Sequence, residues 1–167
     1  GKFFAFQHTR IKPDIIALAK GLASGIPIGA TIAAKEIADS FEKGDHGSTF
    51  GGNPISCKAA NFTINYIIEN NLMKNADVQG VYLLKKLNSI KSKSIREARG
   101  KGLMAGMEMK SNANNIIKKC IEKGLLINLT AEKVLRFLPP LIINKKIIDD
   151  AVRILEGIMD HFDSNEN

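Results

Sequence analysis

The longest apolar region of the chain, residues 15–34, is interrupted by Lys20, several glycines and Pro27. These interruptions argue against a membrane-spanning helix, which needs about 20 consecutive apolar residues. They divide the region into two short runs, one ending at Lys20 and another near residues 28–34, joined by a glycine-rich loop. Short apolar runs bounded by glycine and proline are typical of buried strands, so the sequence predicts two strands here.

Lys20 stands where the first of these strands ends, with small residues around it. At the end of a buried strand an ammonium group is partly desolvated, which frees the amine to attack a carbonyl carbon. This is the chemistry of a lysine that forms a Schiff base. A lysine in this place is more commonly a surface residue whose stem lies along apolar neighbours, and local sequence leaves both interpretations open.

A polar, glycine-rich segment, residues 44–54, precedes a long helical pattern. Its glycines allow main-chain amides to approach a ligand, and Ser48 and Thr49 supply hydroxyl groups that suit phosphate oxygens. Asn53 and Pro54 explain part of the segment without a ligand, because they are a favourable N-cap and first residue of a helix. The sequence therefore predicts a helix entry and, beside it, a candidate phosphate site.

Arg136 lies in a short apolar run, residues 134–138, that ends at a pair of prolines. A strand in this place could hold the guanidinium in the fork geometry that accepts a carboxylate with two hydrogen bonds. An arginine on an edge strand, paired with solvent or with a nearby acid, explains the same residues, and the local sequence favours it. Arg99, in an Arg-Gly-Lys-Gly turn, is assigned a structural role.

Composition excludes several other classes of function. The net charge of +7 invites a nucleic-acid interpretation, but the lysines are scattered, and the one notable cluster, residues 85–96, has no interleaved aromatic residues. Cys57 and Cys120 show no metal-binding spacing and are interpreted as buried free thiols of a cytoplasmic protein. The histidines form no metal or base constellation. We expect no metal, nucleic-acid partner or membrane association.

The order of apolar patterns predicts a mixed α/β chain of two lobes, residues 1–70 and 71–167. The first lobe is expected to hold the two strands and a helix from Pro54 to about Asn70. The second is expected to be a small sandwich of sheet and helices. Its predicted helices and strands are a helix from Asn71 with Val81, Leu84, Leu87 and Ile90 on its apolar face, strands near 95–99, 103–109, 125–129 and 134–138, and helices over 114–123 and 145–161. Ser164 to Asn167 are expected to fray.

Five segments occur in an order that resembles the class III pyridoxal-phosphate aminotransferases. They are residues 14–21, 25–30, 46–54, 99–104 and 134–141. Within that class the chain is most similar to the acetylornithine aminotransferases, particularly over residues 124–130. The resemblance implies the C-terminal part of a fold type I pyridoxal-phosphate-dependent transferase: the end of the large cofactor-binding domain (1–70) and the small C-terminal domain (71–167).

The resemblance also implies roles for particular residues. Lys20 would hold pyridoxal phosphate covalently and then act as general base and acid, while Ser48 and Thr49 would bind the cofactor phosphate. Arg136 would bind the α-carboxylate of amino acid and keto acid substrates. The family is dimeric, with Thr49 reaching the cofactor of the other subunit, so a homodimer with shared active sites is expected.

The implied reaction is transfer of the terminal amine of N-acetylornithine to 2-oxoglutarate, a step of arginine biosynthesis that gives N-acetylglutamate 5-semialdehyde and glutamate. An ornithine, 4-aminobutyrate or succinyldiaminopimelate aminotransferase would share Lys20, Thr49 and Arg136. A non-catalytic basic binding module would require the ordered segments to be coincidental.

Family members are more than twice this length, and the acidic residue under the pyridine nitrogen has no counterpart here. We therefore expect the chain alone to be an incomplete and inactive C-terminal portion.

Overall fold

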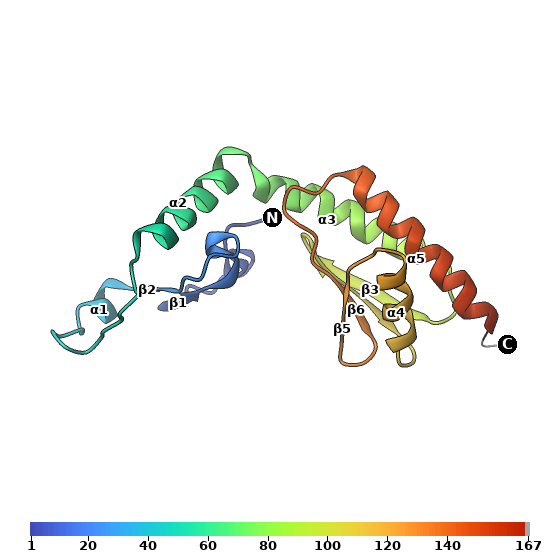
Figure 1. The fold of residues 1–167 in the computed structure, drawn as a ribbon, viewed down its shortest axis with the longest axis horizontal. Helices are drawn as coiled ribbons and strands as arrows, with labels where there is room; N and C mark the ends of the chain where they lie inside the picture. The colour runs from blue at the N-terminus through green and yellow to red at the C-terminus, as the bar shows by residue number, and fades with distance from the viewer. Residues whose placement is uncertain (166–167) are drawn as a thin grey trace. The chain divides into compact units, whose positions relative to one another are not determined.

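The computed structural model describes residues 1–165 and mixes helices with antiparallel strands, which confirms the α/β class (Figure 1). The chain divides into two compact units, described separately below. We call residues 2–71 the N-terminal unit, and Gly1 together with the chain from Leu72 onward the C-terminal unit. None of the described helices is long and apolar enough to cross a membrane.

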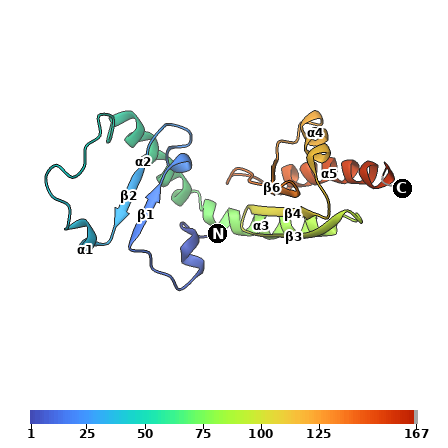
Figure 2. The same ribbon diagram turned by 90° about the horizontal axis from the view of Figure 1, so that it is seen from below.

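The N-terminal unit combines a two-stranded sheet with one long helix. Its elements are the 3-10 helix η1 (Ala5–His8), β1 (Ile15–Leu18), the 3-10 helix η2 (Lys20–Ala23), β2 (Ala30–Ala33), α1 (Lys35–Ala38) and α2 (Pro54–Glu69). Strands β1 and β2 pair antiparallel, as the two arrows in Figure 2 show, with Ile16 opposite Ile32. The two predicted strands are confirmed, although both are shorter than expected.

Helix α2 begins as the sequence predicts. The side chain of Asn53 accepts a hydrogen bond from the backbone N–H of Ser56 at 3.0 Å, and Pro54 is the first helical residue. The Ser56 hydroxyl also donates to the carbonyl oxygen of Pro27 at 2.9 Å, and the hydroxyls of Ser24 and Thr63 lie 3.1 Å apart. These contacts attach the loop after η2 to the first turns of α2.

The prediction that β1 and β2 are buried is wrong. Ile15 on β1 is 55% exposed and Ile32 on β2 is 48% exposed, and every residue of the two strands is either exposed or only half-buried. Other large apolar side chains of the unit are exposed too, among them Phe50 at 82%. The unit thus presents far more apolar surface than its own helices cover.

Residues 1–167 expressed alone are expected to self-associate, because exposed apolar side chains and open strand edges favour association. Sedimentation velocity would show species heavier than the 18.2 kDa chain. Replacing two exposed isoleucines, one on each face of the sheet, by Ile15→Thr with Ile32→Thr keeps β-branched residues in the strands and should reduce the association. A monodisperse monomer from the unaltered chain would contradict this expectation.

The C-terminal unit places helices against an antiparallel sheet of four strands, in the order β3-β4-β6-β5. Its elements are α3 (Leu72–Ser89), β3 (Ile95–Lys101), β4 (Met104–Met109), α4 (Asn114–Glu122), β5 (Asn128–Thr130), β6 (Val134–Phe137) and α5 (Lys145–Asn165). Side chains alternate along β4 and β6, so that Ala105, Met107, Leu135 and Phe137 are buried beneath the helices. We call the opposite side, which carries Arg136, the outer face.

The buried stripe of α3 differs by one position from the expected one. Leu83 and Leu87 are buried as part of a stripe that includes Ala76 and Gly80, whereas Val81 is 69% exposed. The expectation for Val81 is wrong because small residues, which carry little hydrophobic signal, form the close contact with the sheet. An added Cβ at Gly80 would lie 2.1 Å from the carbonyl oxygen of Gly102 in the β3–β4 turn.

Polar contacts connect α3 with α5 and with the segment after β6. Asp149 on α5 accepts a hydrogen bond from the hydroxyl of Tyr82 at 2.8 Å and pairs with Lys86 at 2.7 Å. The side-chain amide of Asn75 donates to the carbonyl oxygens of Leu141 and Ile143. Helix α5 continues through Ser164, which was expected to fray, and residues 166–167 lie outside the described part of the chain.

Candidate functional site

Lys20 has a backbone conformation that is uncommon for a residue with a side chain. Strand β1 ends at Leu18, Ala19 is still extended, and Lys20 turns into the left-handed region with φ of 51° as the first residue of η2. For residues other than glycine this region costs of order 1 kcal/mol, and such residues cluster at functional sites. The strand and turn thereby direct Lys20 out of the sheet at a fixed point.

The side chain of Lys20 lines a cavity of about 490 Å³ within the N-terminal unit. The other lining residues are Gly21, Ser24, Gly25, Ile26, Pro27 and Ile28. Lys20 is exposed, not partly desolvated as the sequence suggested, because the strand that carries it is itself uncovered. No carboxylate among the described residues forms an ion pair with it. Its amine is therefore free to react with a ligand in this cavity.

Ser48 and Thr49 lie in the exposed loop before α2. Gly44 and Gly52 have φ of 108° and 69° there, and an added Cβ at Gly51 would lie 2.8 Å from the Ser48 hydroxyl oxygen. Within residues 1–165 neither hydroxyl has a hydrogen-bond partner, so both are available to a ligand. They do not line the cavity of Lys20, so the chain does not bring the two predicted cofactor-binding features together in that cavity.

Arg136 belongs to the C-terminal unit and lies on an interior strand. Strand β6 pairs with β4 on one side and β5 on the other, so the edge-strand interpretation is wrong. In the register Arg136 lies between Gly106 and Asn128, while its neighbours Leu135 and Phe137 are buried on the other face. Arg136 is exposed, and the described residues offer it no carboxylate partner.

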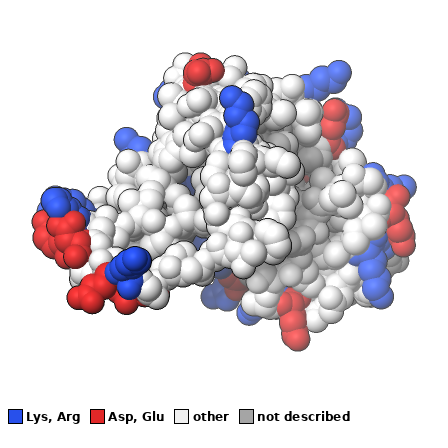
Figure 3. All heavy atoms as spheres, turned by 60° about the vertical axis from the view of Figure 1, so that its left-hand side comes forward, with Lys and Arg blue, Asp and Glu red and all other residues white. Residues whose placement is uncertain are grey.

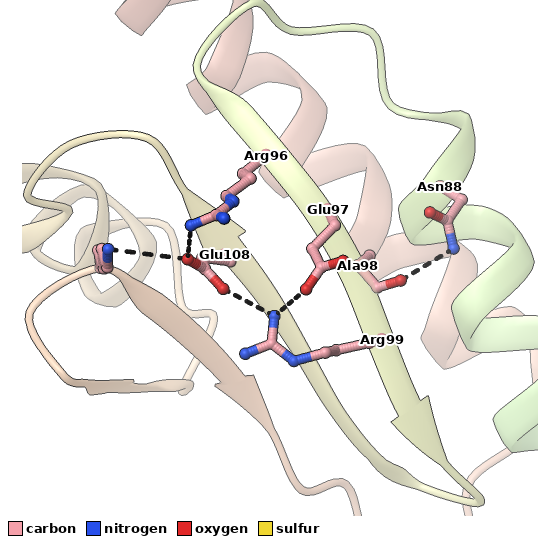
Figure 4. A network of polar contacts seen from close by, with 7 residues as sticks. Asn88, Arg96, Glu97, Ala98, Arg99 and Glu108 are labelled. Carbon is pink, nitrogen blue, oxygen red and sulfur yellow. Dashed lines mark hydrogen bonds and ion pairs between the residues drawn. The ribbon is translucent and has the colours of Figure 1, made fainter.

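Sequence reasoning missed a network of ion pairs centred on Glu108 of β4 (Figure 4). The carboxylate of Glu108, whose side chain is 12% exposed, accepts hydrogen bonds from Arg96 at 2.9 Å and Arg99 at 2.8 Å, and Lys133 lies 3.7 Å away. The hydrogen bond from Arg99 holds the pKa of Glu108 below its ordinary value. A lone acid in the apolar run Met104–Met109 was the available signal, because only a paired carboxylate is stable there.

The cysteines, the potential metal ligands and the basic side chains form no further candidate site. Burial raises the pKa of Cys120 to about 11, so that residue is an inert thiol, while Cys57 is only half-buried, not buried as expected. Across residues 1–165, no cluster of His, Cys, Asp and Glu could hold a metal ion. On the face that Figure 3 shows, Lys and Arg side chains lie beside Asp and Glu, without a continuous basic patch.

Residues 1–159 match the family model for aminotransferase class-III. This chain belongs to the class-III aminotransferases. The family is pyridoxal-phosphate-dependent. Acetylornithine aminotransferase of Aquifex aeolicus is 47% identical over 159 residues, which are 95% of this chain and 41% of the relative. The chain thus spans about two fifths of the length of such class-III relatives.

Solved class-III aminotransferases share the fold. Ornithine delta-aminotransferase of Plasmodium falciparum superposes with a TM-score of 0.91 at 35% identity, over 98% of this chain and 44% of the other. Acetylornithine aminotransferase of Elizabethkingia anophelis gives a TM-score of 0.89 at 31% identity, over 96% and 42%. These neighbours identify the fold expected from the sequence and differ in the substrate their names specify.

The described residues fit the cofactor of a class-III aminotransferase. A covalent attachment needs an amine free of ion pairs, and Lys20 offers one inside a cavity. A phosphate needs donors that the fold has not already used, and the Ser48 and Thr49 hydroxyls meet that requirement. Lys20, Ser48 and Thr49 are therefore chemically compatible with covalent attachment and phosphate contact, although they do not line one cavity.

Proposed function

We propose that the full-length protein is a pyridoxal-phosphate-dependent aminotransferase that transfers the terminal amine of N-acetylornithine to 2-oxoglutarate, in arginine biosynthesis. The observation that carries the aminotransferase proposal is the unpaired Lys20, in a left-handed turn at the end of β1. The 47% identity to an acetylornithine aminotransferase supports the choice of substrate. Residues 1–70 would complete the large cofactor-binding domain, and residues 71–167 would form the small domain.

In this proposal Lys20 has two tasks. Its Nζ would hold the cofactor covalently, and it would also serve as the base that takes the proton from the substrate carbon that bears the amine. Pyridoxal phosphate, when bound, supplies the electron withdrawal that makes this carbon acidic. Ser48 and Thr49 hold the phosphate through their hydroxyls, with Thr49 serving the other subunit of a cytoplasmic homodimer. Arg136 orients the substrate by binding its α-carboxylate.

Ornithine is the second candidate substrate, because a solved ornithine aminotransferase shares the fold at 35% identity. The deciding experiment compares kcat/KM of the purified full-length protein for N-acetylornithine, ornithine, 4-aminobutyrate and succinyldiaminopimelate, with 2-oxoglutarate as the common acceptor. We expect the largest value for N-acetylornithine. A larger value for another donor would reassign the substrate, and no transfer from any donor would reject the aminotransferase proposal.

Replacing Arg136 with alanine in the full-length protein should raise KM for both glutamate and 2-oxoglutarate. The loss should correspond to roughly 2–5 kcal/mol, as expected when one partner of a hydrogen-bonded charge pair is removed. Arg153→Ala is the matched control, because Arg153 is an exposed arginine of the same unit that pairs with Asp150 at 3.0 Å. Steady-state kinetics that leave both KM values unchanged in Arg136→Ala would make Arg136 structural.

A further inference from the structure

The outer face of the C-terminal sheet brings several charges close to Arg136. The cross-strand register places Arg99 of β3, Gly106 of β4 and Arg136 of β6 in one row. Two residues away along each of the same strands, a second row contains Glu97, Glu108 and Val134. Since side chains two residues apart share a face of a sheet, both rows face the same side.

Most cations of this face are already held by carboxylates. Glu108 forms ion pairs with Arg96, Arg99 and Lys133, as Figure 4 shows for the two arginines. Glu97 lies 2.6 Å from the Nη1 atom of Arg99, the nitrogen that also contacts Glu108. Without Arg99 between them, the two carboxylates would face each other unshielded, because Glu97 and Glu108 are direct cross-strand partners. Arg136, by contrast, has no carboxylate among the described residues, and neither does Lys101, which lies two residues beyond Arg99 on β3 and further from Arg136.

Nothing but a glycine separates Arg99 from Arg136 in their row. Two strand spacings amount to about 10 Å between their backbones. Gly106 carries no side chain to fill this interval, and an added Cβ there would lie only 3.2 Å from a methyl carbon of Val134. A released Arg99 could therefore lean across Gly106 and compete with Arg136 for the same carboxylate.

We propose that Glu108 is a positioning residue for substrate binding: by holding Arg99 and Lys133 in ion pairs, it leaves Arg136 as the guanidinium of this face that takes the substrate carboxylate. The proposal rests on the proposed function of Arg136. It assigns Glu108 no contact with the substrate. Its effect is to keep two rival cations, Arg99 and Lys133, away from a carboxylate that binds Arg136.

The test is a double-mutant cycle on the full-length, cofactor-loaded protein, with the dissociation constant of glutarate, an unreactive dicarboxylate, measured by calorimetry. In the wild-type background Arg136→Ala should weaken glutarate binding by about 30-fold or more. In the Glu108→Gln background the same change should cost less than about 5-fold, because Arg99, which then keeps only the exposed Glu97 as a partner, can replace Arg136. A purely structural role of Glu108 would leave the two losses equal.

Matched variants separate charge release from damage to the sheet. Glu97→Gln also removes a carboxylate from Arg99 but leaves its ion pair with Glu108, the less exposed of the two acids, so Arg136→Ala should keep its full effect there. Glu108→Asp retains the charge and should keep the wild-type dependence on Arg136. Arg99→Gln combined with Glu97→Gln removes one charge of each sign and leaves Glu108 paired with Arg96 and Lys133, so this double variant should change glutarate binding by less than about twofold.

The possible results distinguish the role of Glu108 from the proposed role of Arg136. Equal losses in both backgrounds would overturn the role of Glu108 while leaving the aminotransferase proposal intact. No loss from Arg136→Ala in the wild type would overturn the proposed carboxylate site, and this inference with it. If Glu108→Gln does not fold, the Glu97→Gln/Arg99→Gln double variant still decides: a loss of about tenfold or more would show that Arg99 itself binds the ligand and would refute the inference.

Discussion

A Lys20→Ala variant of the full-length protein is expected to lose both the visible absorbance of lysine-bound pyridoxal phosphate and all measurable transamination. Among the described lysines, only Lys20 combines a left-handed backbone with a place in the cavity beside η2. The variant removes covalent attachment and proton transfer together, and general acid–base transfer alone contributes about 10²–10⁴-fold. Absorbance spectroscopy and a glutamate-dependent assay measure the two losses independently.

Lys12→Ala is the matched control, because Lys12 is an exposed lysine of the same unit that precedes β1. It should retain the absorbance and the turnover of the wild type. Borohydride reduction followed by peptide mass analysis should place the cofactor on the peptide that contains Lys20. Retained absorbance and turnover in Lys20→Ala would refute the assignment of Lys20.

Replacing Gly80 with alanine should strongly destabilise the C-terminal unit. The new Cβ would lie 2.1 Å from the carbonyl oxygen and 2.3 Å from the carbonyl carbon of Gly102, so that α3 and the β3–β4 turn must move apart. Overpacking against backbone, which cannot rotate away as a side chain can, should cost about 3 kcal/mol or more. For a unit of this size the melting temperature would fall by roughly 10 °C or more.

Gly157→Ala makes the same chemical change and should have the opposite effect. Gly157 lies inside α5, and an added Cβ there would meet no atom within 4 Å, because this side of the helix lines a cavity of about 540 Å³. Glycine in a helix interior costs about 0.5–1 kcal/mol relative to alanine, so stability should rise by that amount. Urea unfolding followed by circular dichroism measures both changes, and a shift of both midpoints in one direction would contradict the packing described here.

The sequence is sufficient to predict the elements that depend on local signals. The N-cap at Asn53, the proline at position 54 and the short apolar run of β6 each act within a few residues, and the structure confirms these elements. The family follows from the order of the motifs. Predictions that depended on tertiary packing, such as the burial of β1 and of Lys20, failed. The local sequence does not show which faces of a strand are packed against other elements.

The Glu108 network could not be predicted because it depends on the pairing of strands. Its partner Arg96 lies where the register of β3 against β4 shifts between Ile95 and Glu97, and such an irregularity changes which side chains face each other. Lys133 reaches Glu108 from another part of the chain through the β4–β6 pairing. Sequence alone offered only the isolated acid between two methionines.

The interior position of β6 has an entropic consequence for any carboxylate that binds Arg136. The backbone of Arg136 is already ordered by pairing with both β4 and β5, and the contacts of Asn75 hold the segment that follows β6. Binding would therefore immobilise only the side chain, at about 0.5–1.5 kcal/mol. An arginine on a free loop would lose backbone freedom as well, about 1–2 kcal/mol for each residue ordered. Folding of the C-terminal unit thus orders the backbone of Arg136 before any ligand arrives.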